Sequence, residues 1–241
     1  MLETAAKQRK KRPPAQERVK LEVIEIAFVI GVDEAGRGPV LGPMVICAYS
    51  IEEAKENELK KIGARDSKEL TPAKREELFK KLIQMGKFVA VQISAEELTA
   101  LMNKKISLNE IEAIKIASAL TELTSKLEGV EKVVVDSPDP IAQHFEKRIR
   151  KYFDHHAPIH CEHFADKTHP VVSAASIVAK VIRDAEIEKI KKEFGVDLGI
   201  VYTDSPESIE FIIKNLKNPA RQKYLRHMWE TMKRLKFELM D

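Results

Sequence analysis

The chain has 241 residues, of which 44% are hydrophobic and 33% are charged, and its formal net charge is +3. This length and apolar content suffice for a packed core in one large domain or two small ones, and the charge is too small to indicate nucleic-acid binding by itself. We expect a cytoplasmic protein with no membrane span or secretory signal, because the N-terminus is polar and no run of about 18 apolar residues is present. Cys47 and Cys161 are the only cysteines, too few for a disulfide scaffold.

The sequence predicts a basic N-terminal stretch followed by strands and helices. Residues 1–21 include a basic run and no apolar periodicity, so we predict an extension that either adds phosphate affinity or has no dedicated role. Strands are predicted where β-branched and aromatic residues gather, at 27–32, 44–49, 88–93 and 133–135, with 159–163 as a fifth candidate. Helical patterns cover 72–85, 108–127, 140–153, 171–194, 208–216 and 224–239.

This order of elements is compatible with an α/β fold, in which helices flank a mixed sheet of five strands. We predict a main domain at 22–195, which would carry the catalytic residues, and a C-terminal helical segment at 196–241 that packs on it. The last predicted helix has apolar residues at helical spacing, a stripe typical of core packing: Leu225, Met228, Trp229, Met232 and Leu235.

Acidic residues follow two of the predicted strands. Asp33 and Glu34 come after the first strand and open a glycine turn, and Asp136 comes after the fourth. If these strands are adjacent, their carboxylates meet at one edge of the sheet, where Asp166 in a polar turn could join them. Divalent cations prefer such oxygen ligands, so the four acids could hold two cations over one phosphate. Alternatively, Asp33 and Glu34 are solvated and one of them pairs with Arg37, while Asp136 begins a turn or caps a helix.

Five motifs in order resemble those of ribonuclease HII, the type 2 ribonuclease H family, with spacing closest to the archaeal members. They are GVDEAGRGPVLGPMV at 31–45, RDSKELT at 65–71, VVVD at 133–136, FADK at 164–167 and VSAASIVAK at 172–180. The resemblance implies a ribonuclease H fold and an endonuclease that uses Mg²⁺ or Mn²⁺ to cut RNA/DNA hybrids and DNA containing ribonucleotides. It implies cleavage 5′ to the ribonucleotide, leaving 3′-hydroxyl and 5′-phosphate ends. The family's acidic quartet corresponds to Asp33, Glu34, Asp136 and Asp166.

The resemblance also implies substrate contacts in the glycine turn. Gly36, Arg37 and Gly38 would read the 2′-hydroxyl beside the cut, the group that distinguishes RNA from DNA. Two further groups of polar residues lie near helix starts or on one helical face. Their donors could meet phosphate oxygens, or they could serve as caps, surface charges and small residues for helix packing: Arg65, Ser67 and Lys68, and Ser173, Ser176 and Lys180.

The segment at 199–206 departs from the family pattern. It reads GIVYTDSP where the family usually has GSGYPSDP, whose tyrosine stacks at the junction between RNA and DNA. Tyr202 is kept, but Ile200 and Val201 cannot adopt a positive φ as cheaply as glycine. Three alternatives therefore stay open: Tyr202 packs on the core, the enzyme cuts hybrids only, or the chain is a catalytically silent nucleic-acid-binding protein.

A histidine cluster offers a rival metal site, since five histidines lie close to Cys161: His155, His156, His160, His163 and His169. His160 and Cys161 are adjacent on a predicted strand and would point to opposite faces, so a polar strand and turn is the preferred interpretation over structural zinc. We expect a monomer without a membrane partner.

Overall fold

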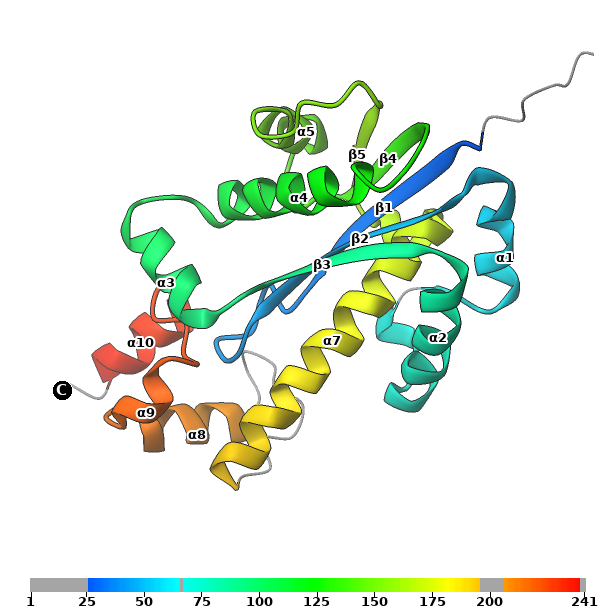
Figure 1. Ribbon diagram of the computed structural model, residues 1–241. Helices are drawn as coiled ribbons and strands as arrows, with labels where there is room; N and C mark the ends of the chain where they lie inside the picture. Colours follow the sequence, from blue (N-terminus) through cyan, green and yellow to red (C-terminus); the bar gives the residue numbers. More distant parts are fainter. Residues whose placement is uncertain (1–25, 66, 196–205, 239–241) are drawn as a thin grey trace, which may run out of the picture.

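The computed structural model describes residues 26–65, 67–195 and 206–238. The basic extension at 1–21, Asp66 and Tyr202 lie outside the described residues. Within the described ranges, helices and strands are arranged in layers around a central sheet (Figure 1).

The central sheet has five strands and is mixed, as the sequence predicted. The strand order is β3-β2-β1-β4-β5, in which β2 is antiparallel to β1 and β3, and β4 is parallel to β1 and β5. The strands are β1 (Phe28–Ala35), β2 (Met44–Glu52), β3 (Lys87–Ile93), β4 (Val130–Asp136) and β5 (Ile159–Glu162). The predicted ends of β1 and β4 were too early. The ladder of β1 with β2 continues through Asp33 and Glu34, which lie opposite Cys47 and Ile46.

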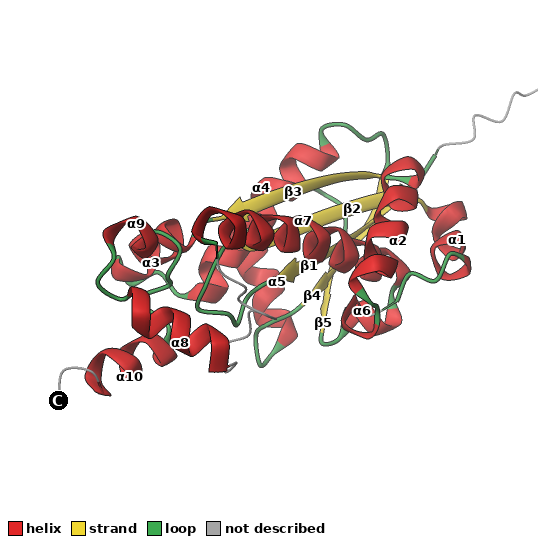
Figure 2. Cartoon of the chain, turned by 90° about the horizontal axis from the view of Figure 1, so that it is seen from below, coloured by secondary structure: helices red, strands yellow, loops and turns green. Residues whose placement is uncertain are grey.

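Helices cover both faces of the sheet, which explains why all but the last residue of β2 are buried. One layer consists of α3 (Ala95–Asn103), α4 (Leu108–Thr124) and α5 (Ala142–Arg150). The other consists of α1 (Glu56–Lys61), α2 (Pro72–Met85), α6 (Ala165–Thr168) and α7 (Pro170–Phe194). Figures 1 and 2 show α7 crossing one face of the sheet with α4 on the other. Along β1, Ile30 and Val32 face the α4 layer, and Val29 faces the α7 layer.

Local signals explain where the long helices begin and end. The Thr71 hydroxyl caps α2 by accepting a hydrogen bond from the Lys74 amide at 3.3 Å, and Ser107 caps α4 in the same way. Helix α7 ends at Phe194 and is followed by the capping residue Gly195, which adopts a φ of 61°. The predicted helices at 108–127 and 140–153 are shorter in the structure, and the short elements α1, α3 and α6 and two short 3-10 helices (Glu53–Lys55 and Ser67–Glu69) were not predicted.

The C-terminal part contains α8 (Pro206–Asn215), α9 (Pro219–Gln222) and α10 (Glu230–Glu238). The predicted helix at 224–239 is wrong over its first six residues, because Leu225 instead forms a β-bridge with Leu41. A separate apolar cluster joins this part to α7 and to the residues after β1. It includes Leu41, Ile187, Ile190, Phe211, Ile212, Leu225, Met232 and Leu235. None of the helices in the described ranges is long and apolar enough to cross a membrane.

Candidate active site

The ends of β1 and β4 bring Asp33, Glu34 and Asp136 together. The parallel register places Val32 beside Val135, so the next residue of each strand is an aspartate. Asp33 is buried on the α7 side, where the Ser176 hydroxyl is hydrogen-bonded to it. Glu34 points to the opposite face, as alternate residues of a strand do. There its charge raises the pKa of Glu112 of α4. The three acids thus surround one end of the sheet from both faces.

Burial raises the pKa values of all three acids, and repulsion from neighbouring carboxylates adds to the shift for Asp33 and Glu34. Burial raises the pKa of Asp33 well above its ordinary value, and the charges of Glu34 and Asp136 raise it further. The pKa of Glu34 is raised mainly by burial, with Arg37 opposing and Asp136 reinforcing the shift. The pKa of Asp136 is raised by burial against the opposing hydrogen bond from the Ala165 amide, at 2.8 Å. Such carboxylates are stabilised in their ionised form by a nearby cation.

Asp166 lies in the first turn of α6. It follows Ala165, whose backbone amide donates a hydrogen bond to the side chain of Asp136. It is 3% exposed, and its backbone carbonyl accepts a hydrogen bond from the Ser173 hydroxyl at 2.6 Å. Helix α6 begins after Phe164, which has a left-handed φ of 57°. This turn lets the amide of Ala165 face Asp136, and Asp166 follows Ala165 in the chain.

The carboxylates of the acidic cluster are suitable ligands for a hard divalent cation, although the side chains are not arranged as a complete coordination shell. Across the described ranges, no three histidine, cysteine, aspartate or glutamate side chains form a group that could hold a metal ion. The fit rests on chemistry: the charge of Asp136 raises the pKa values of Asp33 and Glu34, so the carboxylates interact, and oxygen ligands of this kind suit Mg²⁺ or Mn²⁺.

Two serine hydroxyls form a hydrogen-bonded chain that ends at Asp33. Ser176 and Ser67 are buried, and their Oγ atoms are 2.9 Å apart. A hydroxyl has one proton, so if Ser176 donates to Asp33, Ser67 donates to Ser176. Arg75 in turn donates to the Ser67 carbonyl at 3.0 Å. Ser67, Ser173 and Ser176 therefore hold the acids in place in this structure, and their hydroxyls do not face solvent.

The predicted basic residues lie at different distances from the acids. Lys68 is exposed, and its positive charge lowers the pKa values of Glu34 and Asp136. Arg65 is exposed and lies 3.9 Å from Glu69. Lys180 pairs with Asp184 one helical turn further along α7. Among these three, Lys68 is the cation that acts on the carboxylates.

The glycine turn after β1 is held against α4. Gly36 has a φ of 84°, which favours glycine. Arg37 pairs with Glu112 and donates to the Asn109 side chain at 2.7 Å, while Gly38 is exposed. Glu112 is 1% exposed, and burial followed by the charge of Glu34 raises its pKa to about 8.

Sequence reasoning missed Asn109 and Glu112, and also the buried arginines Arg183 and Arg226. Glu112 had a detectable signal, because it lies between Leu108 and Ile116 at helical spacing, on a stripe that is otherwise apolar. A charged residue on such a stripe requires a buried partner. Arg226 gave no such signal, because the predicted helix does not form at this residue and its carbonyl partners lie 184 and 189 residues away in the sequence.

The histidines of the rival metal site have other neighbours. His155 and His156 are stacked with ring centroids 4.4 Å apart, and His169 lies 3.0 Å from Glu162. The His163 ring is 2.7 Å from the Asp139 carbonyl. Phe164, beside His163, is 68% exposed, with the Lys167 ammonium 5.3 Å from its ring centroid.

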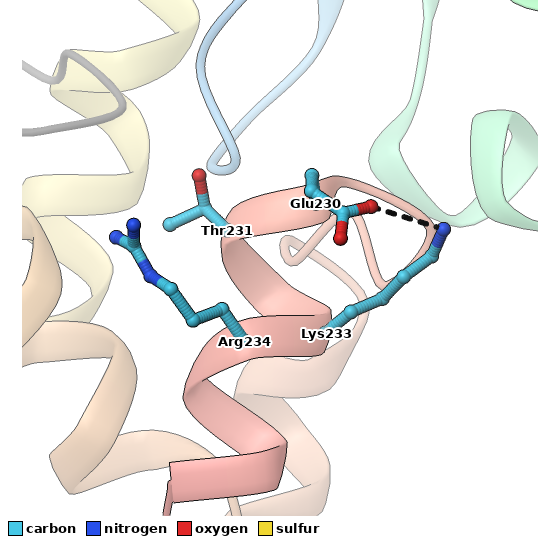
Figure 3. Close-up of a pocket in the computed structure, with 4 residues that line it drawn as sticks. All are labelled: Glu230, Thr231, Lys233 and Arg234. Atoms are coloured by element: carbon cyan, nitrogen blue, oxygen red, sulfur yellow. Dashed lines mark hydrogen bonds and ion pairs between the residues drawn. The ribbon is translucent and has the colours of Figure 1, made fainter.

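A hollow at the start of α10 is separate from the predicted site residues (Figure 3). It is lined by Glu230, Thr231, Lys233 and Arg234, and Glu230 lies 3.3 Å from Lys233. None of its lining residues belongs to the acidic cluster or the glycine turn.

Known proteins share this fold and are similar to this chain in sequence. A family model described as Ribonuclease HII matches residues 30–232. Ribonuclease HII of Pyrococcus abyssi (strain GE5 / Orsay) is 40% identical over 209 residues, covering 86% of this chain and 90% of that one. The crystal structure of ribonuclease H2 from Pyrococcus horikoshii OT3 is 38% identical, with a TM-score of 0.79, covering 89% of this chain and 99% of that one. In the PCNA:RNase HII complex from Archaeoglobus fulgidus, the matched chain is 32% identical, with a TM-score of 0.74, covering 84% of this chain and 95% of that one.

The mixed five-stranded sheet with its flanking helices is a ribonuclease H fold. The chain belongs to the ribonuclease HII family, and these relatives are archaeal, as the motifs indicated. It is therefore an endoribonuclease, a hydrolase that acts on RNA in RNA/DNA hybrids. Family membership argues against the catalytically silent alternative.

Proposed function

We propose that this endoribonuclease depends on Mg²⁺ or Mn²⁺ and also cuts DNA at embedded ribonucleotides, on their 5′ side. The observation that carries the proposal is the convergence of Asp33, Glu34 and Asp136 at the ends of β1 and β4, where burial raises the pKa of each and the charge of Asp136 raises those of Asp33 and Glu34 further. With Asp166, these residues would hold the metal. The bound cation would supply positive charge to the scissile phosphate and lower the pKa of water, so that a nucleophile forms at neutral pH.

The side chains around the acids hold them in a defined orientation. The hydroxyl of Ser176 orients Asp33, and the Ala165 amide at 2.8 Å orients Asp136. Lys68 adds positive charge, which favours the ionised form of Glu34 and Asp136 and would attract the phosphate backbone. These supports fix the carboxylates before substrate arrives, which lowers the cost of reaching the reactive geometry.

Substrate recognition is assigned to the glycine turn and the basic residues. Gly36, Arg37 and Gly38 would approach the 2′-hydroxyl, and Arg65 and Lys68 would contact phosphates. Ser67, Ser173 and Lys180 were predicted to contact the substrate directly. Their contacts with Ser176, with the Asp166 carbonyl and with Asp184 favour an indirect role.

The junction tyrosine and the domain organisation remain parts of the proposal. Tyr202 would stack at the junction between RNA and DNA, and residues 196–241 would form a segment that packs on the main domain at 22–195. The protein is proposed to act as a monomer. A sliding-clamp partner such as PCNA is suggested only by the complex of the Archaeoglobus fulgidus relative.

The test uses two substrates of equal length: a DNA duplex with one ribonucleotide and a full RNA/DNA hybrid. Each is incubated with the wild type in Mg²⁺, in Mn²⁺ and in a chelator, and the product ends are mapped. The proposal expects metal-dependent cutting of both, with a 3′-hydroxyl on the 5′ side of the ribonucleotide. Equal cleavage in the chelator would refute the metal requirement.

A second candidate is a nuclease restricted to hybrids. It is favoured by the departure at 199–206, where Ile200 and Val201 replace small residues next to Tyr202. Metal-dependent cutting of the hybrid without cutting of the single-ribonucleotide duplex would support it over the main proposal.

A further inference from the structure

Two buried arginines hold the carbonyl groups of the glycine loop, defined here as residues 36–43. Arg226 is 0% exposed and donates from Nε to the Gly42 carbonyl at 2.9 Å and from Nη1 to the Arg37 carbonyl at 3.1 Å. Arg183 of α7 donates to the Pro43 carbonyl at 3.2 Å and to the Leu41 carbonyl at 3.4 Å. Four carbonyls of one loop thus point toward two guanidinium groups.

The main chain of the C-terminal part follows the same loop. The Arg226 amide donates to the Val40 carbonyl at 2.9 Å, and the Gly42 amide donates to the Tyr224 carbonyl at 2.9 Å. Between these bonds, Leu41 forms a β-bridge with Leu225. Residues 224–226 therefore lie along the glycine loop like a short extra strand, and the side chain of Arg226 continues the contact to Arg37.

Burying the Arg226 guanidinium costs free energy that an apolar side chain of similar size would not. Arg226 packs over the Trp229 ring at 4.9 Å, an environment that an apolar side chain could also occupy. Burying a charge costs several kcal/mol, and replacing buried charges with apolar residues is often neutral or stabilising. What the apolar residue cannot supply is the planar fork, which binds two carbonyls in a fixed geometry.

We propose that Arg226 is a positioning residue for substrate recognition: it binds the carbonyls of Arg37 and Gly42 and so fixes the path along which Gly36, Arg37 and Gly38 meet the ribonucleotide. This inference rests on the proposed function, in which these three residues read the 2′-hydroxyl. It assigns part of the ribonucleotide specificity to a side chain in the C-terminal part, which contacts the loop through main-chain carbonyls.

The C-terminal part offers a matched control in Arg221. Its guanidinium lies 4.4 Å from the Phe194 ring centroid and donates to the Asn215 side chain at 2.5 Å. Like Arg226, Arg221 packs on an aromatic ring and makes hydrogen bonds, but its bonds join helices and do not reach the glycine loop. Arg221→Met therefore reports the loss of an arginine that is structural only.

The experiment compares Arg226→Met, Arg226→Lys and Arg221→Met. Binding is measured in an Asp136→Asn background, so that the substrate is not cut, on a duplex with one ribonucleotide and on the same duplex made of DNA only. Amide hydrogen exchange is followed in peptides that cover residues 36–43, because it reports the loop without substrate. Thermal unfolding confirms that each variant is folded, and Arg226→Lys keeps the charge if the methionine variant does not fold.

We expect Arg226→Met to lower the preference for the ribonucleotide duplex by roughly 10-fold or more, since displacements of about 1 Å can cost 100-fold. Exchange at residues 36–43 should become faster, with Arg226→Lys intermediate and Arg221→Met unchanged. A folded Arg226→Met protein with the parent's preference and loop exchange would overturn the inference, as would an equal loss in Arg221→Met. If the parent itself shows no preference, the proposed reading of the 2′-hydroxyl fails, and the exchange data still decide whether Arg226 fixes the loop.

Discussion

Replacing Gly36 with alanine tests whether the glycine loop is packed against Arg183. A Cβ atom at this position would lie 2.0 Å from Arg183 Nε and 2.3 Å from its Cδ, and the φ of 84° is unfavourable for alanine. The backbone conformation alone costs about 1–2 kcal/mol. Moving the guanidinium would break at least one of its bonds to the loop carbonyls, each worth about 1.5–3 kcal/mol for a charged donor. We expect Gly36→Ala to lower the free energy of unfolding by about 2.5–5 kcal/mol.

The control is Gly63→Ala, because Gly63 has a similar φ of 89° and a Cβ atom added there would meet no other atom within 4 Å. This variant should cost only the backbone strain of about 1–2 kcal/mol. Both free energies of unfolding are measured by urea titration in the same buffer, and their difference isolates the contact with Arg183. Equal losses in the two variants would refute the reasoning, because they would show that Arg183 moves away without cost.

Three further predictions concern the acids. Ser176→Ala removes the hydroxyl that lowers the pKa of Asp33, so the metal concentration for half-maximal cleavage should rise roughly 10-fold, and an unchanged value in a metal titration would contradict this. Without metal, Asp33, Glu34 and Asp136 keep their protons longer in the folded protein than in the unfolded chain. The contribution of these three acids to stability should therefore be fully present below their ordinary pKa values and be lost as the pH rises, and Mn²⁺ should reverse that loss in thermal melts. The pKa of Glu112 is raised to about 8 from 4.5, so Glu112→Gln should flatten the loss of stability between these pH values, and an identical slope would count against its burial as an acid.

The sheet was predictable because its signals are local. β-branched runs bounded by turn residues identified the strands, and the acids after two of them indicated a shared edge. Neighbouring strands then needed only a parallel register, with Val32 beside Val135, to bring Asp33 and Asp136 together. The assignment of the four acids to catalysis stays a prediction, but the meeting of Asp33, Glu34 and Asp136 needed no information beyond strand ends and motif order.

The supports of the site were not predictable because their partners are remote in sequence. Arg37 and Glu112 are 75 residues apart, and Arg226 is 189 residues from the carbonyl of Arg37 that it binds. The helical stripe at 224–239 was a real local preference, but hydrogen bonds with the glycine loop override it at Tyr224 and Arg226. A periodic pattern cannot show that a segment has a better partner elsewhere in the chain.

The most direct test of the central claim is the rate at which Asp136→Asn cuts an RNA/DNA hybrid in Mg²⁺ and in Mn²⁺. Wild type and Asp154→Asn are measured beside it, because Asp154 is an exposed acid outside the cluster. If the acids at the end of the sheet hold the metal, Asp136→Asn should lose roughly 100-fold or more in rate, since metal-bound charge contributes several kcal/mol, and Asp154→Asn should match the wild type. Full activity of a folded Asp136→Asn protein would contradict the assignment of the catalytic site.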